Sequence, residues 1–375
     1  MNAPVELAPE WYRVANADEV FSPALLVYPE QIAANVERML SFTGSAARLR
    51  PHVKTHKLAE IVRIHQSSGI HKFKCATIAE GEMLAKCGAQ HVLFAYQPVG
   101  PNVSRLLELI RRFPKTGFAA IVDNAATILT LSSAAKTHNS TLEFLLDLDC
   151  GMHRTGVAPD SRAIDLYRLL ARSPGIVPGG LHAYDGHICD RNPAKRASTA
   201  MEAIAPVIDL RARLLALNLP VPRTVVGGTA TLSVHARNPD IECSPGTCVL
   251  WDAGYESLFP DLGFHSAAAV LARVVSTLPG NRLCLDLGYK AIAAESPSPC
   301  VKFFGLSGAT IAMQNEEHLV LETPHAEEYK PGDVLYGIPW HICPTVAMHD
   351  RVAVIRSNRW TATWKVEARD RILTI

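Results

Sequence analysis

Short apolar runs alternate with amphipathic segments from about residue 22 to residue 250. The runs have the length and composition of buried strands. They lie at Ala24–Tyr28, Arg48–Val53, Lys72–Thr77, His91–Tyr96, Phe118–Val122, Glu143–Leu148, Gly180–Tyr184, Arg223–Val226 and Ile241–Leu250. Between them, apolar residues recur at the spacing of a helix face, as Ile204, Val207 and Ile208 do. This alternation predicts an α/β fold, a (β/α)8 barrel of the TIM type, with an open doubly wound sheet as the alternative.

The pattern changes after residue 255, where the apolar runs are short and are broken by Gly, Pro and Asn. These runs lie at Ala267–Leu278, Arg282–Leu287, His318–Leu321, Val334–Gly337 and Arg351–Ile355. Because no long helical pattern separates them, they predict a smaller, mainly antiparallel β domain. We therefore expect a barrel domain at residues 22–255 and a β domain at residues 256–375 that carries the metal corner and includes residues 1–21.

Composition narrows the classes of function. Hydrophobic residues make up 48% of the chain and charged residues 19%, and the net charge is +1, so we expect neither a nucleic-acid nor a membrane partner. No apolar run has the length of a membrane span, and the first residues lack the pattern of a secretory signal. Nine cysteines without a CxxC pair argue against a disulfide framework. We expect a cytoplasmic enzyme.

The segment Arg50–Lys57, which reads RPHVKTHK, carries cations and imidazoles at the end of a predicted strand. In α/β proteins, the carboxyl ends of strands are where chemistry takes place. A lysine whose amine is partly desolvated there has a lowered pKa and becomes a nucleophile. The alternative is a solvated basic turn, since lysines are mostly surface residues.

Three more predicted strand ends carry polar groups. Asp147–Gly156 places two acids, a histidine and an arginine between glycines, and in the next segment Tyr184 offers a ring that can stack on a flat ligand. In Val225–Thr231, two glycines allow close approach of the backbone to an anion, and Cys243–Thr247 adds further backbone donors. Barrels hold phosphate in the loops after strands seven and eight. Solvated turns and a core tyrosine are the alternatives.

The predicted β domain contains the segment IPWHICPTV, with His341 and Cys343 two residues apart. Along an extended segment these side chains share a face. Nitrogen with thiolate sulfur suits zinc, and other borderline divalent ions are possible. Two protein ligands leave room for water or substrate, which is a catalytic layout. The alternative is a pair that binds no metal.

Together these stretches resemble the D-threonine aldolase and D-serine dehydratase family of pyridoxal-phosphate enzymes, which share the alanine-racemase-type barrel. The resemblance covers nearly the whole chain and includes two β-domain segments, Asp286–Lys290 and Gln314–His318. It implies that Lys54 holds the cofactor covalently and that His341 and Cys343 bind a divalent metal, zinc or manganese. It further implies cofactor contacts from His52, Arg154, Tyr184, Gly227, Gly228, Thr229, Gly246 and Thr247.

Two positions depart from the aldolases. Their metal corner is His-x-Asp, which suits manganese, whereas the dehydratases have His-x-Cys, as at Cys343 here. The aldolases also place a histidine six residues after the tyrosine, where this chain has Asp190, with His187 nearby. His187 and Asp190 are therefore both candidate catalytic bases.

The resemblance implies a lyase for D-β-hydroxy-amino acids. We expect retro-aldol cleavage of D-threonine-like substrates to glycine and an aldehyde, in which a metal activates the β-hydroxyl. The first alternative is a D-serine or D-3-hydroxyaspartate dehydratase, in which Lys54 removes the α-proton and a 2-oxo acid and ammonia result. An amino-acid racemase and a non-catalytic pyridoxal-phosphate carrier are the others. A homodimer is implied.

Overall fold

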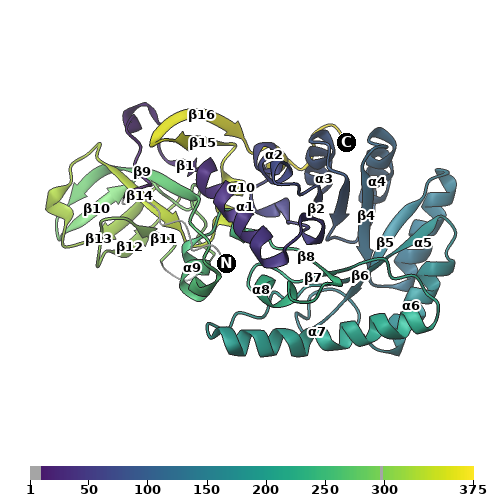
Figure 1. Cartoon of the computed structure of the whole chain (residues 1–375). Helices are drawn as coiled ribbons and strands as arrows, with labels where there is room; N and C mark the ends of the chain where they lie inside the picture. Colours follow the sequence, from purple (N-terminus) through teal and green to yellow (C-terminus); the bar gives the residue numbers. More distant parts are fainter. Residues whose placement is uncertain (1–9, 296–298) are drawn as a thin grey trace. The chain divides into compact units, whose positions relative to one another are not determined.

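The computed structural model describes residues 10–295 and 299–375, and its backbone divides into two compact units (Figure 1). We call them the barrel unit, residues 39–54, 62–246 and 370–375, and the β unit, residues 1–38, 55–61 and 247–369. Of residues 1–21, which we expect in the β domain, residues 1–9 lie outside the described residues. No helix of the described part of the chain is both long and apolar enough to cross a membrane.

The barrel unit is built on a curled sheet of seven parallel strands in the order β2-β3-β4-β5-β6-β7-β8. The strands are β2 (Lys72–Cys75), β3 (His91–Phe94), β4 (Gly117–Val122), β5 (Leu142–Leu148), β6 (Ile176–Ala183), β7 (Thr224–Val226) and β8 (Ile241–Cys243). Residues 49–52 bridge the two edge strands, because Leu49 pairs with Cys243 and His52 pairs with Lys74, both in parallel. The predicted TIM-type barrel is therefore confirmed.

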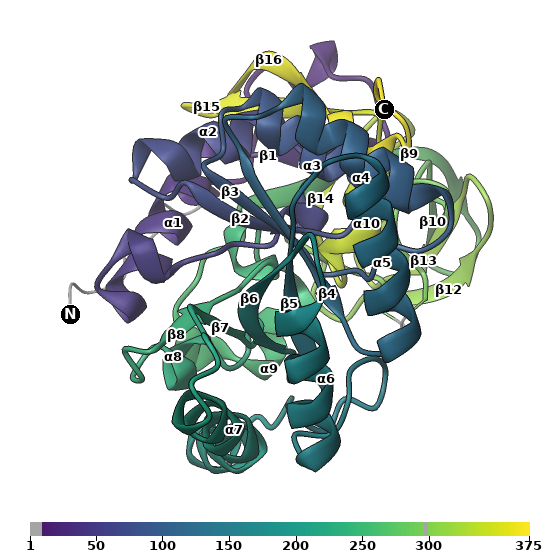
Figure 2. The same ribbon diagram turned by 90° about the vertical axis from the view of Figure 1, so that its right-hand side faces the viewer.

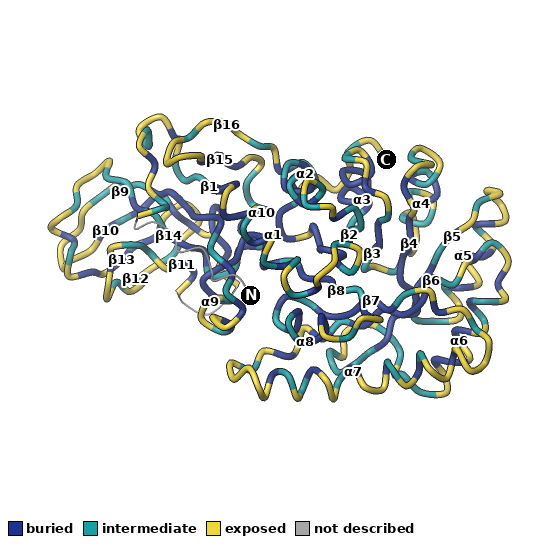
Figure 3. Tube along the Cα trace, viewed as in Figure 1, coloured by how far each residue is buried: buried dark blue, intermediate teal, exposed yellow. Residues whose placement is uncertain are grey.

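The helices of this unit follow the strands and lie outside the sheet (Figure 2). They are α3 (Ile78–Lys86), α4 (Pro101–Arg112), α5 (Ala125–Thr137), α6 (Ser161–Arg172), α7 (Pro193–Ala216) and α8 (Leu232–His235), while α1 (Pro29–Thr43) and α2 (Ala59–Ser67) have residues in both units. Thr77, Asn124, Asp160 and Asn192 accept backbone hydrogen bonds as N-caps, which sets where four helices begin. Figure 3 shows that the strands of the barrel unit are mostly buried, whereas its helices have many exposed residues.

The barrel interior is layered, since alternate residues of each strand point inward. On β5, Glu143 lies at the amino-terminal end, Leu145 in an apolar middle layer and Asp147 near the carboxyl end. The middle layer also contains Leu93, Ala119, Ile121 and Val225. The charged floor below it and the polar carboxyl end above it are thus separated by apolar side chains.

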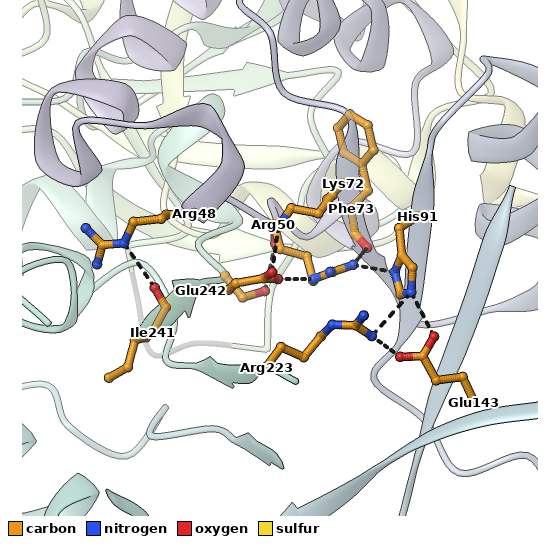
Figure 4. A network of polar contacts seen from close by, with 10 residues as sticks. Arg48, Arg50, Lys72, Phe73, His91, Glu143, Arg223, Ile241 and Glu242 are labelled. Carbon is orange, nitrogen blue, oxygen red and sulfur yellow. Dashed lines mark hydrogen bonds and ion pairs between the residues drawn. The ribbon is translucent and has the colours of Figure 1, made fainter. Parts of the chain in front are cut away.

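The floor is a network of buried and half-buried charges (Figure 4). Arg50 donates to Glu242 at 2.9 Å and to His91 Nδ1 at 2.9 Å, while Lys72 pairs with Glu242 at 2.5 Å. Burial, then the charge of Arg50, lowers the pKa of His91 to about 3, so His91 is neutral and donates through Nε2 to Glu143. The charged groups of the floor are thus paired with one another, which indicates that this network has a structural role.

The β unit is a nine-stranded, mainly antiparallel sheet in the order β12-β13-β10-β9-β1-β15-β16, with β11 on β14 and β14 on β9. Its strands are β1 (Ala24–Val27), β9 (Ala268–Leu278), β10 (Arg282–Leu285), β11 (Val301–Phe303), β12 (Thr310–Gln314), β13 (Leu319–Glu322), β14 (Val334–Pro339), β15 (Arg351–Arg356) and β16 (Arg359–Lys365). Two short helices, α9 (Ala253–Leu258) and α10 (Ile342–Met348), belong to it. The predicted second, antiparallel β region is confirmed.

The strand at residues 24–27 corrects the predicted strand count. The sequence pattern assigns Ala24–Tyr28 to the barrel, but β1 pairs antiparallel with β9 and parallel with β15 in the β unit. An apolar run that is buried on both faces carries no signal for which sheet it joins. In the barrel, residues 49–52 form the first strand. The strand β7, which is the eighth apolar run in the sequence pattern, is therefore the seventh barrel strand, and β8 is the eighth.

Candidate active site

Lys54 lies in a short 3-10 helix, Val53–Thr55, immediately after the segment that closes the barrel. Its side chain is exposed. Its backbone N–H donates to Nδ1 of the buried His52 at 3.2 Å, and the backbone N–H of His52 donates to the Pro245 carbonyl at 2.8 Å. His52 thereby fixes the backbone from which Lys54 projects and ties it to the loop after β8.

Three cations surround the half-buried ring of Tyr184, which follows β6. The distance to the ring centroid is 4.9 Å from Arg154 Cζ and 5.9 Å from Lys54 Nζ and from Lys74 Nζ. A Cβ at Gly186 would lie 2.3 Å from the Tyr184 ring. Only glycine at residue 186 therefore leaves room for the ring. The sequence-predicted Lys54, Arg154 and Tyr184 are therefore brought together.

Lys74 is the member of this group that the sequence pattern did not single out. It lies on β2 and is only 2% exposed. Burial, and after it the positive charge of Lys54, lowers the pKa of Lys74 to about 7. The desolvated lysine expected in the RPHVKTHK segment is thus found on the neighbouring strand. The sequence feature that could have identified Lys74 is its spacing of two residues from Lys72, which places both lysines on the same face of the strand.

Two buried aspartate–histidine pairs lie at the same end of the barrel unit. Asp147 accepts from His182 Nδ1 and Asp185 accepts from His235 Nε2, each at 2.6 Å, and Thr231 donates to Asp185 at 3.0 Å. Burial lowers the pKa of His182. In that neutral ring Nε2 is an acceptor, and it is buried without a hydrogen-bond partner among the described residues. Sequence reasoning assigned these pairs no role.

The glycine turn after β7 has the backbone shape expected of an anion cradle. Gly227 has φ +76°, and a Cβ there would meet the His235 ring at 2.8 Å. Its N–H donates to the Ala183 carbonyl at 3.0 Å, and the Gly246 N–H donates to Thr229 Oγ1 at 3.1 Å. Within the described residues, no hydrogen bond engages the Gly228 N–H, so this amide is the best placed of the three to bind a ligand.

These residues fit pyridoxal phosphate. An exposed lysine amine suits its aldehyde, a half-buried aromatic ring suits its flat ring, and cations with the Gly228 amide suit its phosphate. The unpartnered His182 Nε2 marks this end of the barrel as built for a polar ligand. All of them belong to the barrel unit.

In the β unit, His341 and Cys343 are neighbours, but not through strand alternation. β14 ends at Pro339, His341 is the N-cap of α10, and Cys343 lies in the first turn of that helix. The pKa of His341 is raised to about 9, mainly because His341 forms a hydrogen bond with Cys343. His341 also bonds the Glu295 carboxylate through Nδ1. The prediction of an extended segment was wrong, because the helix begins at Ile342.

The donor set at this corner suits a borderline divalent ion, with an imidazole nitrogen, a sulfur and a nearby carboxylate. Cys343 Sγ lies 3.3 Å from Thr55 Oγ1 and 3.6 Å from Thr247 Oγ1. Within the described residues, however, no group of three or more His, Cys, Asp or Glu side chains has the geometry of a metal site. The pair therefore fits an ion only if water or substrate completes its shell.

The two candidate bases lie in different surroundings. His187 is exposed and its ring lies against Gly151, since a Cβ at that glycine would be 2.8 Å from Nε2. Asp190 forms an ion pair with Lys195 at 2.7 Å, and the hydrogen bond from Lys195 is the main reason that its pKa is lowered. His187 thus borders the loop that carries Arg154, whereas the carboxylate of Asp190 is engaged at the start of α7.

Comparisons with known proteins agree with this fold along nearly the whole chain. The model of the alanine racemase N-terminal domain matches residues 27–250, and that of a serine dehydratase domain matches residues 267–355. A D-threonine aldolase from Arthrobacter sp. is 28% identical over 93% of this chain and 93% of its own. A D-threo-3-hydroxyaspartate dehydratase from Delftia sp. is 24% identical over 92% and 96%. The crystal structure of D-threonine aldolase from Filomicrobium marinum superposes with a TM-score of 0.88 at 26% identity, covering 98% and 99%.

Proposed function

We propose that this chain, which belongs to the alanine racemase N-terminal domain family and continues into a serine dehydratase domain, is a pyridoxal-phosphate-dependent lyase of D-β-hydroxy-amino acids. The best-supported reaction is retro-aldol cleavage of D-threonine-like substrates to glycine and an aldehyde. The observation that carries the proposal is the grouping of Lys54, Arg154 and Tyr184 at the carboxyl end of the barrel. The names of the aldolase and dehydratase relatives support it.

Lys54 is the residue that holds the cofactor, because its amine is exposed beside the tyrosine ring. Arg154 and Tyr184, which lie against each other, would contact the cofactor ring, and the Gly228 amide would bind the phosphate. His52, Gly227, Thr229, Gly246 and Thr247 complete the predicted contacts, the glycines by shaping the turns. When bound, pyridoxal phosphate supplies an electron sink for negative charge at the α-carbon of the substrate.

His341 and Cys343 hold a divalent metal, zinc or manganese, in this proposal. The chemistry that such an ion supplies is a lowered pKa of the hydroxyl oxygen it binds. Carbon–carbon cleavage also needs a base for the hydroxyl proton. Of the two candidates, His187 is the stronger, because Asp190 is already paired with Lys195.

A dehydratase is the second candidate function, and Cys343 is the observation that favours it. A thiolate ligand suits zinc better than manganese. If Lys54 removes the α-proton and the β-hydroxyl leaves as hydroxide, the product is a 2-oxo acid with ammonia. The substrate would then be D-serine or D-3-hydroxyaspartate.

Product analysis on D-threonine tests the proposal. Purified protein with cofactor and added zinc or manganese should release acetaldehyde and glycine, whereas 2-oxobutanoate with ammonia indicates the dehydratase. Conversion to the L-isomer indicates a racemase, and bound cofactor without any turnover indicates a carrier. A chelator should abolish the lyase activity, and L-threonine is the matched control substrate.

We also propose a homodimer in a reducing, cytoplasmic compartment. The nine cysteines are free thiols, which suits such a compartment. Light scattering after size exclusion should give twice the chain mass of 40.8 kDa, and a mass of one chain would contradict the dimer.

A further inference from the structure

Asp185 is a buried acid to which the proposed function gives no role. It directly follows Tyr184 in the loop after β6 and is only 2% exposed. Thr231 Oγ1 donates to Asp185 Oδ1 at 3.0 Å, and His235 Nε2 donates to Asp185 Oδ2 at 2.6 Å. Both donors are buried as well. Asp185, Thr231 and His235, which we call the Asp185 cluster, therefore use both oxygens of one carboxylate inside the protein.

The Asp185 cluster joins two loops of the barrel unit. The strands β6 and β7 are parallel neighbours, with Ala183 in register with Val226 (Figure 2). The first residue after β7, Gly227, donates its N–H to the Ala183 carbonyl at 3.0 Å. The hydrogen bond from Thr231 to Asp185 joins the same two loops a second time. The turn at residues 227–231 is thus fastened to the β6 loop at both of its ends.

The two glycines of this turn pack against different parts of the β6 loop. A Cβ at Gly227 would lie 2.8 Å from the His235 ring and 3.0 Å from Thr231 Oγ1. A Cβ at Gly228 would instead lie 3.2 Å from the Tyr184 ring. The peptide bond that carries the Gly228 N–H therefore joins a residue packed on the Asp185 cluster to a residue packed on the tyrosine.

Thr231 uses its hydroxyl for this contact and not for the helix that it begins. It is the N-cap of α8, where a threonine hydroxyl ordinarily accepts a backbone N–H of the first turn. Thr77 does so for α3. Among the described residues, no backbone N–H of α8 donates to the Thr231 hydroxyl, which donates to Asp185 instead. The local structure of α8 alone would favour the cap, so the contact between the loops calls for another explanation.

We propose that Asp185 is a positioning residue that, through Thr231 and His235, holds the turn at residues 227–231 in the shape that binds the cofactor phosphate beside the Tyr184 ring. The physical basis is preorganisation, because a turn that is already ordered needs no further ordering when an anion binds. The inference rests on the proposed function, since it takes the Gly228 amide as a donor to that phosphate.

Two ligands that differ only in the phosphate test this role. Pyridoxamine 5′-phosphate and pyridoxamine have the same ring and carry no aldehyde, so neither becomes covalently bound to Lys54. Calorimetric titration of the full-length, cofactor-free protein gives the dissociation constant of each. The ratio of the two constants, pyridoxamine over its phosphate, measures what the phosphate contributes. A general loosening of the site weakens both ligands together and leaves this ratio unchanged.

The ratio should fall when the Asp185 cluster is broken. Asp185→Asn should lower it about tenfold, because the amide then turns a donor toward Thr231 or His235 and the turn loses its order. The loss of a negative charge would by itself favour a phosphate anion, so a lower ratio reports the lost hydrogen bonds. Thr231→Val should lower the ratio too, whereas Thr231→Ser, which keeps the hydroxyl, should preserve it.

Thr116→Val is the matched control. Thr116 is also a buried threonine of the barrel unit, and its hydroxyl donates to the Ala89 carbonyl at 2.9 Å. This variant loses one buried hydrogen bond, as Thr231→Val does, but away from the turn. Its ratio should equal that of the wild type.

Every outcome decides the question. An unchanged ratio in Thr231→Val overturns the inference and leaves the lyase proposal standing, even where Asp185→Asn folds poorly. A wild type that binds both ligands equally well overturns it too, because the turn then holds no phosphate. A wild type that binds neither overturns both proposals. A ratio that falls as expected, together with a failed product analysis, supports the role of Asp185 and contradicts the lyase reaction.

Discussion

Replacing the buried Lys74 by methionine should change how the stability of the protein depends on pH. In the folded protein the pKa of Lys74 is about 7, whereas an unfolded lysine has a pKa of about 10.4. The folded pKa is the lower one, so between these values the unfolded chain binds the extra proton. Stability therefore rises with pH in this window, and the cost of burying the charge is fully present below pH 7.

The magnitude follows from the gap between the two pKa values. One pKa unit corresponds to about 1.4 kcal/mol, so the full gap amounts to about 4.6 kcal/mol. From pH 7 to pH 9, the folded state loses the second half of its Lys74 proton while the unfolded state keeps nearly all of it. Integration over this interval shows that the free energy of unfolding of the wild type should rise by about 2 kcal/mol relative to that of Lys74→Met.

Urea unfolding of the cofactor-free protein at pH 7, 8 and 9 measures the effect. The quantity compared is the free energy of unfolding of the wild type minus that of Lys74→Met at each pH. A difference that stays constant within about 0.5 kcal/mol from pH 7 to pH 9 would refute the reasoning, because Lys74 would then titrate as it does in the unfolded chain. Lys72→Met is the control, since the partner of Lys72 is the Glu242 carboxylate.

Four further predictions concern the site and its scaffold. Lys54→Ala should lose the visible absorbance of the lysine-bound cofactor together with all turnover, as a spectrum and a coupled assay will show. Cys343→Asp, which replaces sulfur by oxygen, should shift the metal preference from zinc to manganese and raise the ratio of acetaldehyde to 2-oxobutanoate. His187→Gln should lower kcat about 100-fold, whereas Asp190→Asn should change it less than threefold, about the scatter of single-site effects. Glu242→Gln should cost about 3 kcal/mol of unfolding free energy in urea, because it leaves the buried Arg50 without its carboxylate.

The sequence pattern predicts the parallel sheet and the antiparallel sheet well, and its error concerns the sheet to which residues 24–27 belong. Apolar runs followed by amphipathic helices mark β2 to β8, and caps such as Thr77 and Asn124 set helix starts. Residues 24–27 carry the same apolar signal but pair with β9 and β15. Their partners lie far along the chain, and local periodicity contains no information about such pairing.

The site shows the same division between local and non-local information. The positions of Lys54, Arg154 and Tyr184 at strand ends are readable because chemistry in a barrel gathers at the carboxyl ends of its strands. That they meet at one ring depends on the barrel closing through His52 and Lys74. His341 and Cys343 were expected to be neighbours, and they are, although the helix that begins at Ile342 provides the geometry.

Lys74 shows why a charged residue in a strand cannot be interpreted from the sequence alone. Alternation places Lys72 and Lys74 on one face of β2, and in most sheets the face with lysines is the solvent face. In a closed barrel that face is the interior, so the same pattern puts one lysine in a compensated floor network and the other beside Lys54. Among the described residues, no ion pair offsets the free-energy cost of burying Lys74.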